Sequence, residues 1–358
     1  MTKPQAIISA DSHVTVKHDQ VKANLARKHH ADYDAAVDDF SKWFLGGGKS
    51  VARANQAGLD TYNRAVGRPG NHDPKARLLD MDLDGVDTEV LYCELSAYRY
   101  LYMVKDAATE ATRAFNNTLQ QFAAEDPARL IVNYQIPIND IPTAVAEVER
   151  VAALGGKSLQ LPVFPGEVGM PDYFNTVYDP LWSVVQETGL PICFHIGLNL
   201  AVDNLAKRDP TPRLGLTVPC IPPMTTEALG MWLLTGVLER FPDLKLVFVE
   251  PGLTWVAWYL FFVDDMVEWQ GYEFPEIKEL PSFYYHRNVN LTFIKEPDAI
   301  DHLRHRLGTR NLLWSTDYPH PVTSWPQSQA IIEKQFRDVS PADRELMLSG
   351  NAKRVWKI

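Results

Sequence analysis

Eight short runs of apolar and β-branched residues are spaced along the whole chain. They lie at 6–13, 88–94, 130–138, 157–163, 191–197, 244–252, 288–294 and 312–320. Several are almost continuously apolar, which is typical of strands covered on both faces of a sheet. Helical patterns separate most of them, at 106–125, 141–153, 173–188, 225–240, 253–269 and 296–307. This alternation predicts an α/β fold with a parallel sheet, and the eight strands favour a (β/α)8 TIM barrel over a doubly wound sheet.

Three segments are longer than the connections that such a barrel needs. The first, 14–87, follows the first strand, and the others are the Pro-rich segment 198–223 and the segment 270–287. We expect the first insertion and the long loops to lie over the C-terminal mouth of the barrel as a lid. No repeat or low-complexity linker divides the sequence, so we expect residues 1–358 to form a single domain. Ser340 before Pro341 predicts a helix cap, followed by one or two closing helices.

Composition argues against several classes of partner. The chain is 46% hydrophobic and has a formal net charge of -10 with no run of Lys or Arg, so we expect no nucleic-acid or anionic membrane surface. The longest aromatic and apolar run, at 255–263, is far shorter than the roughly 20 residues of a membrane-spanning helix. Cys93, Cys193 and Cys220 form no CxxC pair, and the first residues, MTKPQ, hold no apolar signal segment. These features predict a reduced, cytoplasmic protein.

The segment WVAWYLFFVDDMVEW at 255–269 has two apolar stripes at helical spacing. One stripe comprises Trp255, Trp258, Tyr259, Phe262 and Met266, and the other comprises Val256, Leu260, Val263 and Val267. A helix that is apolar on nearly all sides is buried on more than one of them. We expect one side to face the barrel and the other to face an insertion or a second subunit. A homo-oligomer, dimeric or larger, is the favoured assembly, with a hetero-oligomer as the alternative.

Residues of metal-binding types stand at the C-terminal ends of the predicted strands. Asp11 and His13 end the first strand, and because they are two residues apart they point to the same face. The others stand at or just beyond the ends of the fifth, sixth and eighth strands: His195, Glu250, Asp317 and His320. In a barrel these ends converge on one mouth.

Imidazole and carboxylate groups in one place suit Zn, Mn, Fe or Co. Buried carboxylates cost several kcal/mol each unless a cation compensates them. The sequence therefore predicts a divalent metal centre that acts on a small-molecule substrate.

Several segments resemble the amidohydrolase-related family, the amidohydrolase 2 group that includes the aminocarboxymuconate-semialdehyde decarboxylase type. The segments are ADSHV (10–14), FHIG (194–197), VEPGLTWV (249–256), LLWSTDYPHPVTSWP (312–326), 73–92 and 124–138, so the resemblance covers nearly the whole chain. It implies a metal-dependent barrel enzyme with one ion held by four residues: Asp11, His13, His195 and Asp317.

Two positions depart from the family pattern. The first-strand motif is DxH rather than HxH, and the oxygen of Asp11 keeps Zn, Mn and Fe all as candidates. Glu250 stands where many relatives have a catalytic histidine, so their general base cannot be transferred. His72, in GNHDP within the first insertion, is either a turn residue or another ligand. If His72, Glu250 and His320 all face the metal, a second ion can bind, although one ion is the favoured number.

The leading hypothesis is a hydrolase or non-oxidative decarboxylase acting on a small carboxylated or cyclic molecule. Asp317 would act as the acid or base: it would accept a proton from metal-bound water in hydrolysis, or give a proton to carbon in decarboxylation. Glu250 or His320 would steer that proton. The alternative is a non-haem iron or mixed-metal oxygenase, because two histidines with carboxylates also suit iron. A catalytically silent partner subunit on a retained barrel is the second alternative.

Overall fold

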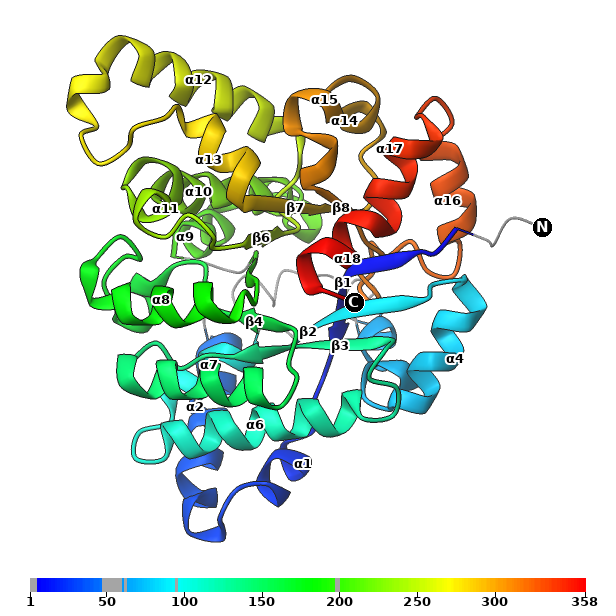
Figure 1. The fold of residues 1–358 in the computed structure, drawn as a ribbon. Coiled ribbons are helices and arrows are strands. Elements are labelled where there is room, and N and C mark those ends of the chain that lie inside the picture. Colours follow the sequence, from blue (N-terminus) through cyan, green and yellow to red (C-terminus); the bar gives the residue numbers. More distant parts are fainter. Residues whose placement is uncertain (1–4, 47–59, 61–62, 94–95, 197–199) are drawn as a thin grey trace.

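The computed structural model describes residues 5–46, 60, 63–93, 96–196 and 200–358. Eight strands form one sheet in chain order, and each is parallel to the next. They are β1 (Ile8–Val14), β2 (Thr88–Cys93), β3 (Leu130–Gln135), β4 (Ser158–Gln160), β5 (Ile192–His195), β6 (Leu246–Val249), β7 (Val289–Phe293) and β8 (Leu312–Trp314). With helices outside them, they confirm the predicted (β/α)8 TIM barrel and exclude the doubly wound alternative (Figure 1).

The first strand meets the segment after the last strand, and this contact closes the barrel. The backbone N–H of His13 donates to the carbonyl of Tyr318 at 2.6 Å, and the N–H of Asp317 donates to the carbonyl of Asp11 at 3.0 Å. Ser12 pairs with Tyr318 in an isolated parallel bridge. The closure therefore lies among the residues predicted to carry the chemistry.

Alternate strand residues fill the inside of the barrel. A compact apolar cluster joins strand residues with the last helix, α18 (Asn351–Trp356), and comprises Ile8, Ala10, Val90, Tyr92, Ile131, Cys193, Val247, Val249, Leu313, Ala352, Val355 and Trp356. The indole N–H of Trp356 donates to Oγ of Ser158, the first residue of β4, at 2.9 Å. The C-terminal helix therefore closes the end of the barrel where the strands begin, and the opposite end stays available for a site.

Helices surround the strands (Figure 1). The predicted patterns form α6 (Ala108–Ala123), α7 (Ile141–Ala153), α8 (Asp179–Thr188), α10 (Thr225–Leu234), α12 (Thr254–Gln270) and α14 (Pro297–His302). Two of the predicted helices, 225–240 and 296–307, are interrupted, and their second parts form the short helices α11 (Val237–Arg240) and α15 (Arg304–Leu307). The first break falls before Gly236, whose φ of 75° is a left-handed conformation that glycine adopts without strain.

The first insertion contains helices that no pattern in the sequence predicted. They are α1 (His18–Ala23), α2 (His30–Gly46) and α4 (Pro74–Asp84), with the 3-10 turns η1 (Arg27–His29) and η3 (Pro69–Asn71). The ends of α4 carry clear signals: Asp73 accepts a hydrogen bond from the N–H of Lys75 at 2.9 Å, and Gly85 follows with a φ of 73°. In the described part of the insertion, α1 contacts α6, and α2 contacts α5 (Ser96–Met103).

The remaining connections are also partly helical. The Pro-rich segment contains α9 (Leu200–Arg208), η6 (Pro212–Leu214), η7 (Val218–Cys220) and η8 (Pro222–Met224), and the third insertion contains η9 (Gly271–Glu273) and α13 (Pro281–Asn288). After β8 come α16 (Ser328–Gln335), α17 (Pro341–Glu345), a π-helical turn (Leu346–Gly350) and α18. The shorter 3-10 turns are η4 (Pro165–Val168), η5 (Thr176–Tyr178) and η10 (Thr309–Asn311). Oγ of Ser340 accepts from the N–H of Asp343 at 3.1 Å, which confirms the predicted cap.

Only one of the two apolar stripes of helix α12 is buried. Val256, Leu260 and Val263 are buried, whereas Trp258 and Phe262 of the other stripe are 61% and 51% exposed. Three further large side chains on or just beyond the helix are exposed as well: Phe261, Trp269 and Tyr272. Within the single chain, α12 is therefore buried on one side only, and not on the two sides that were predicted.

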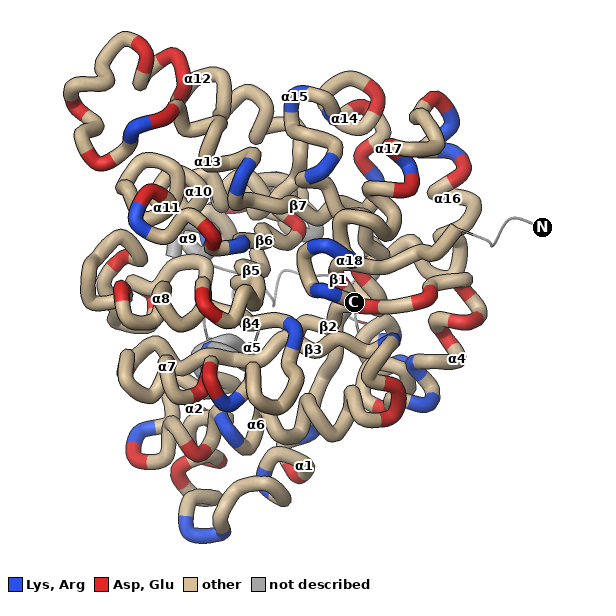
Figure 2. The backbone as a smooth tube through the Cα atoms, viewed as in Figure 1, with Lys and Arg blue, Asp and Glu red and all other residues tan. Residues whose placement is uncertain are grey.

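Acidic and basic residues are interspersed over the outer helices rather than separated by sign (Figure 2). None of the helices in the described ranges has the length and apolar character needed to cross a membrane.

Candidate metal centre

The structure brings six of the seven predicted site residues together at the C-terminal ends of the strands. β1 supplies two, β5 supplies one, and the turns after β6 and β8 supply the rest: Asp11, His13, His195, Glu250, Asp317 and His320. β8 ends at Trp314, so Asp317 lies beyond the strand that it was expected to end. Its backbone bond to Asp11 holds it in place beside β1.

The possible ligand atoms form two overlapping groups. Within each group, one atom from every residue lies within 4.8 Å of the others; the first group is Asp11, His13, His195 and Glu250, and the second is His13, Glu250, Asp317 and His320. Nε2 of His195 lies 3.5 Å from Oδ1 of Asp11 and 3.8 Å from Oε2 of Glu250. Nε2 of His13 lies 3.9 Å from Oδ1 of Asp11 and 3.0 Å from Oδ1 of Asp317.

Two carboxylates of the cluster are fully buried and lack hydrogen bonds of good geometry. Asp11 and Asp317 are both 0% exposed, and among the described residues their oxygens have imidazole nitrogens nearby, at 3.0 and 2.9 Å from Oδ1 of Asp317, but no well-aligned hydrogen bond. Nε2 of His195 also has none. Buried polar groups are normally hydrogen-bonded, and a buried, unpaired carboxylate is costly. A divalent cation would satisfy these atoms, so the donor set fits a metal.

The cluster has an excess of negative charge. Burial raises the pKa of Glu250 well above its usual range, and the carboxylates of Asp317 and Asp11 raise it further. Burial alone would lower the pKa of His195, but Asp11, helped by Glu250, raises it to about 9. Both shifts express the same electrostatic preference for added positive charge. A bound cation supplies that charge.

Glu250 and Asp317 share an unusual backbone conformation. Their φ angles are 56° and 55°, in the left-handed region that residues other than glycine rarely adopt. Such a conformation costs on the order of 1–3 kcal/mol and is typical of functional sites. The N–H of Glu250 donates to Oγ1 of Thr292 at 2.8 Å, which helps to hold the turn after β6.

Hydrogen bonds behind the cluster orient its histidines. Nδ1 of His195 lies 2.8 Å from the carbonyl of Ile196, which favours a proton on Nδ1 and leaves the Nε2 lone pair facing the carboxylates. The ring of His320 stacks on that of His13, with centroids 3.8 Å apart. Nδ1 of His320 lies 2.9 Å from Oδ1 of Asp317.

A buried arginine that was not singled out from the sequence supports the end of β1. Arg77, on α4, is 0% exposed and donates from Nη1 to the carbonyls of His13 at 2.8 Å and Gly70 at 3.1 Å. Its guanidinium also pairs with Glu89 and lies 4.3 Å from the centre of the Tyr318 ring. A lone arginine within a helical segment resembles a surface residue, so only the fold reveals this role.

His72 belongs to neither group of ligand atoms. It ends η3, next to the Asp73 cap of α4. Burial and the charge of Lys17 lower its pKa, while Asp73 opposes the shift. Its place next to that cap is the one expected of a turn residue before Asp73-Pro74.

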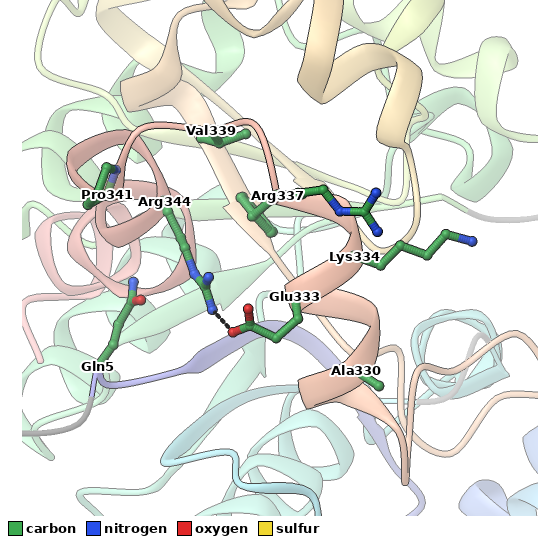
Figure 3. A pocket seen from close by; sticks show the side chains of 9 residues that line it. Gln5, Ala330, Glu333, Lys334, Arg337, Val339, Pro341 and Arg344 are labelled. Atoms are coloured by element: carbon green, nitrogen blue, oxygen red, sulfur yellow. Dashed lines mark hydrogen bonds and ion pairs between the residues drawn. The ribbon is translucent and has the colours of Figure 1, made fainter.

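A separate surface hollow lies between α16 and α17 (Figure 3). It is lined by Gln5, Ala330, Glu333, Lys334, Phe336, Arg337, Val339, Pro341 and Arg344. Gln5 precedes β1, so this hollow is at the end of the barrel where the strands begin. It contains none of the six clustered residues, and Glu333 is already paired with Arg344.

Comparisons of sequence identify distant relatives. The chain is 22% identical over 287 residues to 2-amino-3-carboxymuconate-6-semialdehyde decarboxylase of Dictyostelium discoideum, covering 78% of this chain and 75% of that protein. It is 25% identical over 313 residues to gamma-resorcylate decarboxylase of Polaromonas sp., covering 79% and 90% respectively.

Solved structures share the fold. 5-Carboxyvanillate decarboxylase of Sphingomonas paucimobilis has a TM-score of 0.73 at 21% identity, with 99% of both chains covered. A dihydroxybenzoic acid decarboxylase of Polaromonas sp., solved with manganese and the inhibitor 2-nitroresorcinol, has a TM-score of 0.74 at 20% identity, covering 99% of this chain and 97% of that one.

The family model described as amidohydrolase matches residues 11–358, from the first clustered aspartate to the last residue. This match confirms the resemblance found in the strand-end motifs. The chain belongs to the amidohydrolase family.

Proposed function

We propose that this protein is a metal-dependent, non-oxidative decarboxylase of a small carboxylated aromatic acid. The observation that carries the proposal is the Asp317 carboxylate, which is fully buried in a cluster of metal-ligand types, with imidazole nitrogens of His13 and His320 beside its Oδ1. The proposal is supported by relatives with the same fold that are named as decarboxylases of such acids.

The first-strand pair and His195 would hold the ion, while Asp317, the fourth ligand that the family resemblance implies, lies in the second group of ligand atoms. The candidates stay Zn, Mn and Fe, and we favour Mn because the dihydroxybenzoic acid decarboxylase structure contains it. When bound, a divalent ion acts as a Lewis acid toward the oxygen atoms of a substrate and helps to orient it. Burial of the ligands keeps bulk water away from the reacting groups.

Asp317 would deliver the proton. Its Oδ1 lies 3.0 Å from Nε2 of His13 and 2.9 Å from Nδ1 of His320, so Oδ2 can hold a proton. As the bond between the ring carbon and the carboxylate breaks, CO2 leaves and the electron pair stays on the ring carbon. That carbon takes the proton from Oδ2, and His320 steadies the other oxygen. Glu250 lies 3.8 Å from Nε2 of His195 and shares a group of ligand atoms with Asp317, so it would help to steer the proton.

The test is turnover of the Mn2+-loaded protein with 2,6-dihydroxybenzoate and 5-carboxyvanillate, with and without oxygen. We expect CO2 release at equal rates in both atmospheres. In D2O, one deuterium should appear at the carbon that lost the carboxylate. Turnover that stops without oxygen would instead establish the oxygenase alternative. A protein that holds metal but releases no CO2 from a panel of carboxylated phenols would contradict the proposal and favour the silent subunit.

We also propose that the protein forms a homo-oligomer through the exposed side of α12, the face that carries Trp258 and Phe262. Large contiguous apolar patches on a soluble chain commonly mark interfaces, and a symmetric pair can bury the same patch twice. A cytoplasmic location is part of the same proposal, and it is supported by three free cysteines: Cys93, Cys193 and Cys220.

A further inference from the structure

The six clustered residues cannot all bind one ion in the observed arrangement. Ligand atoms that lie about 2.0–2.2 Å from one ion are at most about 4.4 Å from each other. The structure instead divides the six into two groups, and only His13 and Glu250 belong to both. A single ion in the first group leaves Asp317 and His320 outside its shell, although both oxygens of Asp317 are buried.

We propose that a second divalent cation binds beside the first, held by Glu250, Asp317 and His320. The inference rests on the proposed function, because it takes the first ion as held by the first-strand pair and His195. Asp317 is fully buried, so its carboxylate contacts the cluster and not solvent. Asp317 and His320 are 2.9 Å apart, a separation suited to two adjacent ligands of one ion.

Glu250 is the residue that can join the two sites. It is the only carboxylate that belongs to both groups. A carboxylate has two oxygens and can bind two ions at once, whereas a histidine at this position would direct a single nitrogen into the cluster. The ions of two-metal sites are about 3.5–4 Å apart, a distance that one bridging carboxylate spans. The departure from the family's sixth-strand histidine therefore changes how many ions the mouth can hold.

His13 and His320 would serve different ions. Their rings are stacked, with centroids 3.8 Å apart and an angle of 27° between the planes. Oδ1 of Asp317 lies close to a nitrogen of each ring, at 3.0 Å from Nε2 of His13 and 2.9 Å from Nδ1 of His320. Oδ2 of Asp317 stays available for the proton in the proposed reaction.

Charge balance favours two ions when the substrate is an acid. The cluster contains three carboxylates: Asp11, Glu250 and Asp317. With neutral histidines and the proton that Asp317 carries in the proposed reaction, one divalent ion leaves the cluster with no net positive charge to attract a substrate carboxylate. Two divalent ions leave two positive charges, and a substrate carboxylate neutralises one of them. The main role of the second ion would therefore be to bind the carboxylate of the substrate.

The test counts Mn2+ without relying on activity. Metal-free protein is titrated with Mn2+, and free Mn2+ is followed by electron paramagnetic resonance. We expect two equivalents to bind, with a spin-coupled signal from the pair. Glu250→Gln and His320→Asn should each bind one equivalent and show the hyperfine pattern of isolated Mn2+. Glu296→Gln is the matched control, because this half-buried glutamate accepts a hydrogen bond from Leu253 outside the cluster and the amide keeps that bond.

Saturation of the wild-type protein at one equivalent would overturn the second site, whether or not the variants fold. If such a one-ion protein releases CO2, the proposed function stands while this inference fails. If two ions bind but no carboxylated phenol reacts, the inference stands and the proposed function fails. Circular dichroism of each variant shows whether a lost ion reflects a lost ligand or a lost fold.

Discussion

The backbone N–H of Asp317 donates to the carbonyl of Asp11 at 3.0 Å, so the hydrogen bond that closes the barrel also fixes two carboxylates of the candidate metal centre. Both side chains lie near Nε2 of His13, which is 3.9 Å from Oδ1 of Asp11 and 3.0 Å from Oδ1 of Asp317. The two carboxylates are therefore brought together by the same contact, between β1 and the segment after β8, that closes the barrel.

Replacing His195 by Ala should weaken metal binding while leaving the fold largely intact. The side chain offers Nε2 to the cluster, and its ring packs against those of His13 and Tyr92, which is a small part of the packing inside the barrel. We expect at least a tenfold rise in the Kd for Mn2+, since loss of even an outer-shell partner costs about 10–100-fold in metal affinity. Equilibrium dialysis with elemental analysis measures the change. Unchanged Mn2+ affinity would remove His195 from the ligand set.

Replacing Asp317 by Asn tests the proton-transfer role. The amide keeps the shape of the side chain but cannot deliver a carboxyl proton, and general acid–base catalysis contributes about 10²–10⁴-fold. We expect kcat for CO2 release to fall by about that factor. Deuterium incorporation at the vacated carbon should slow in parallel. If the variant keeps its kcat, a residue other than Asp317 donates the proton, and Glu250→Gln would then be the next variant to measure.

Removing the metal should destabilise the protein. Three carboxylates, Asp11, Glu250 and Asp317, lie in one cluster, so repulsion among them destabilises the metal-free protein. Binding to the folded state alone stabilises by about 2.7 kcal/mol when the free ion is at 100 times its Kd. We expect chelation to lower the melting temperature by several degrees and Mn2+ to restore it. Mg2+ serves as the control for a general salt effect, because hard oxygen sites rather than imidazole suit it.

We expect Arg77 to contribute strongly to stability, although it is not one of the clustered site residues. The side chain is fully buried, pairs with Glu89 and holds the carbonyl of His13, so Arg77→Met would leave a buried, unpaired carboxylate. Breaking such a pair costs about 3–5 kcal/mol. We expect that loss in the free energy of urea unfolding, and a smaller loss for the double variant with Glu89→Gln. Equal losses in the single and double variants would show that packing, not charge, explains the role of Arg77.

The sequence predicted the fold and most of the candidate site because both depend on local patterns. Runs of apolar residues predicted all eight strands, and polar residues at their ends predicted that side chains near opposite ends of the chain would meet. Helix α4 was not predicted, although Asp73 and Gly85 mark both its ends, because it lies within the first insertion, outside the regular alternation of strands and helices.

The division of the cluster into two groups could not be predicted. It depends on distances set by the barrel closure and on the left-handed turns at Glu250 and Asp317, and neither appears in a one-dimensional pattern. The role of Arg77 could not be predicted for the same reason, since its partners lie on three different segments, one of them β1.

Substitution on the exposed side of α12 tests the assembly. Trp258 is 61% exposed and stacks on Phe262, with ring centroids 5.6 Å apart, so a charge at this position would oppose burial of the patch against a second copy. We expect Trp258→Glu to shift the protein from oligomer to monomer in light scattering after gel filtration, with an unchanged circular dichroism spectrum. Leu83→Glu is the matched control, because Leu83 is 69% exposed on α4, away from α12. If the wild-type protein is already a monomer at micromolar concentration, or if both variants keep the wild-type mass, then α12 is not the interface between copies.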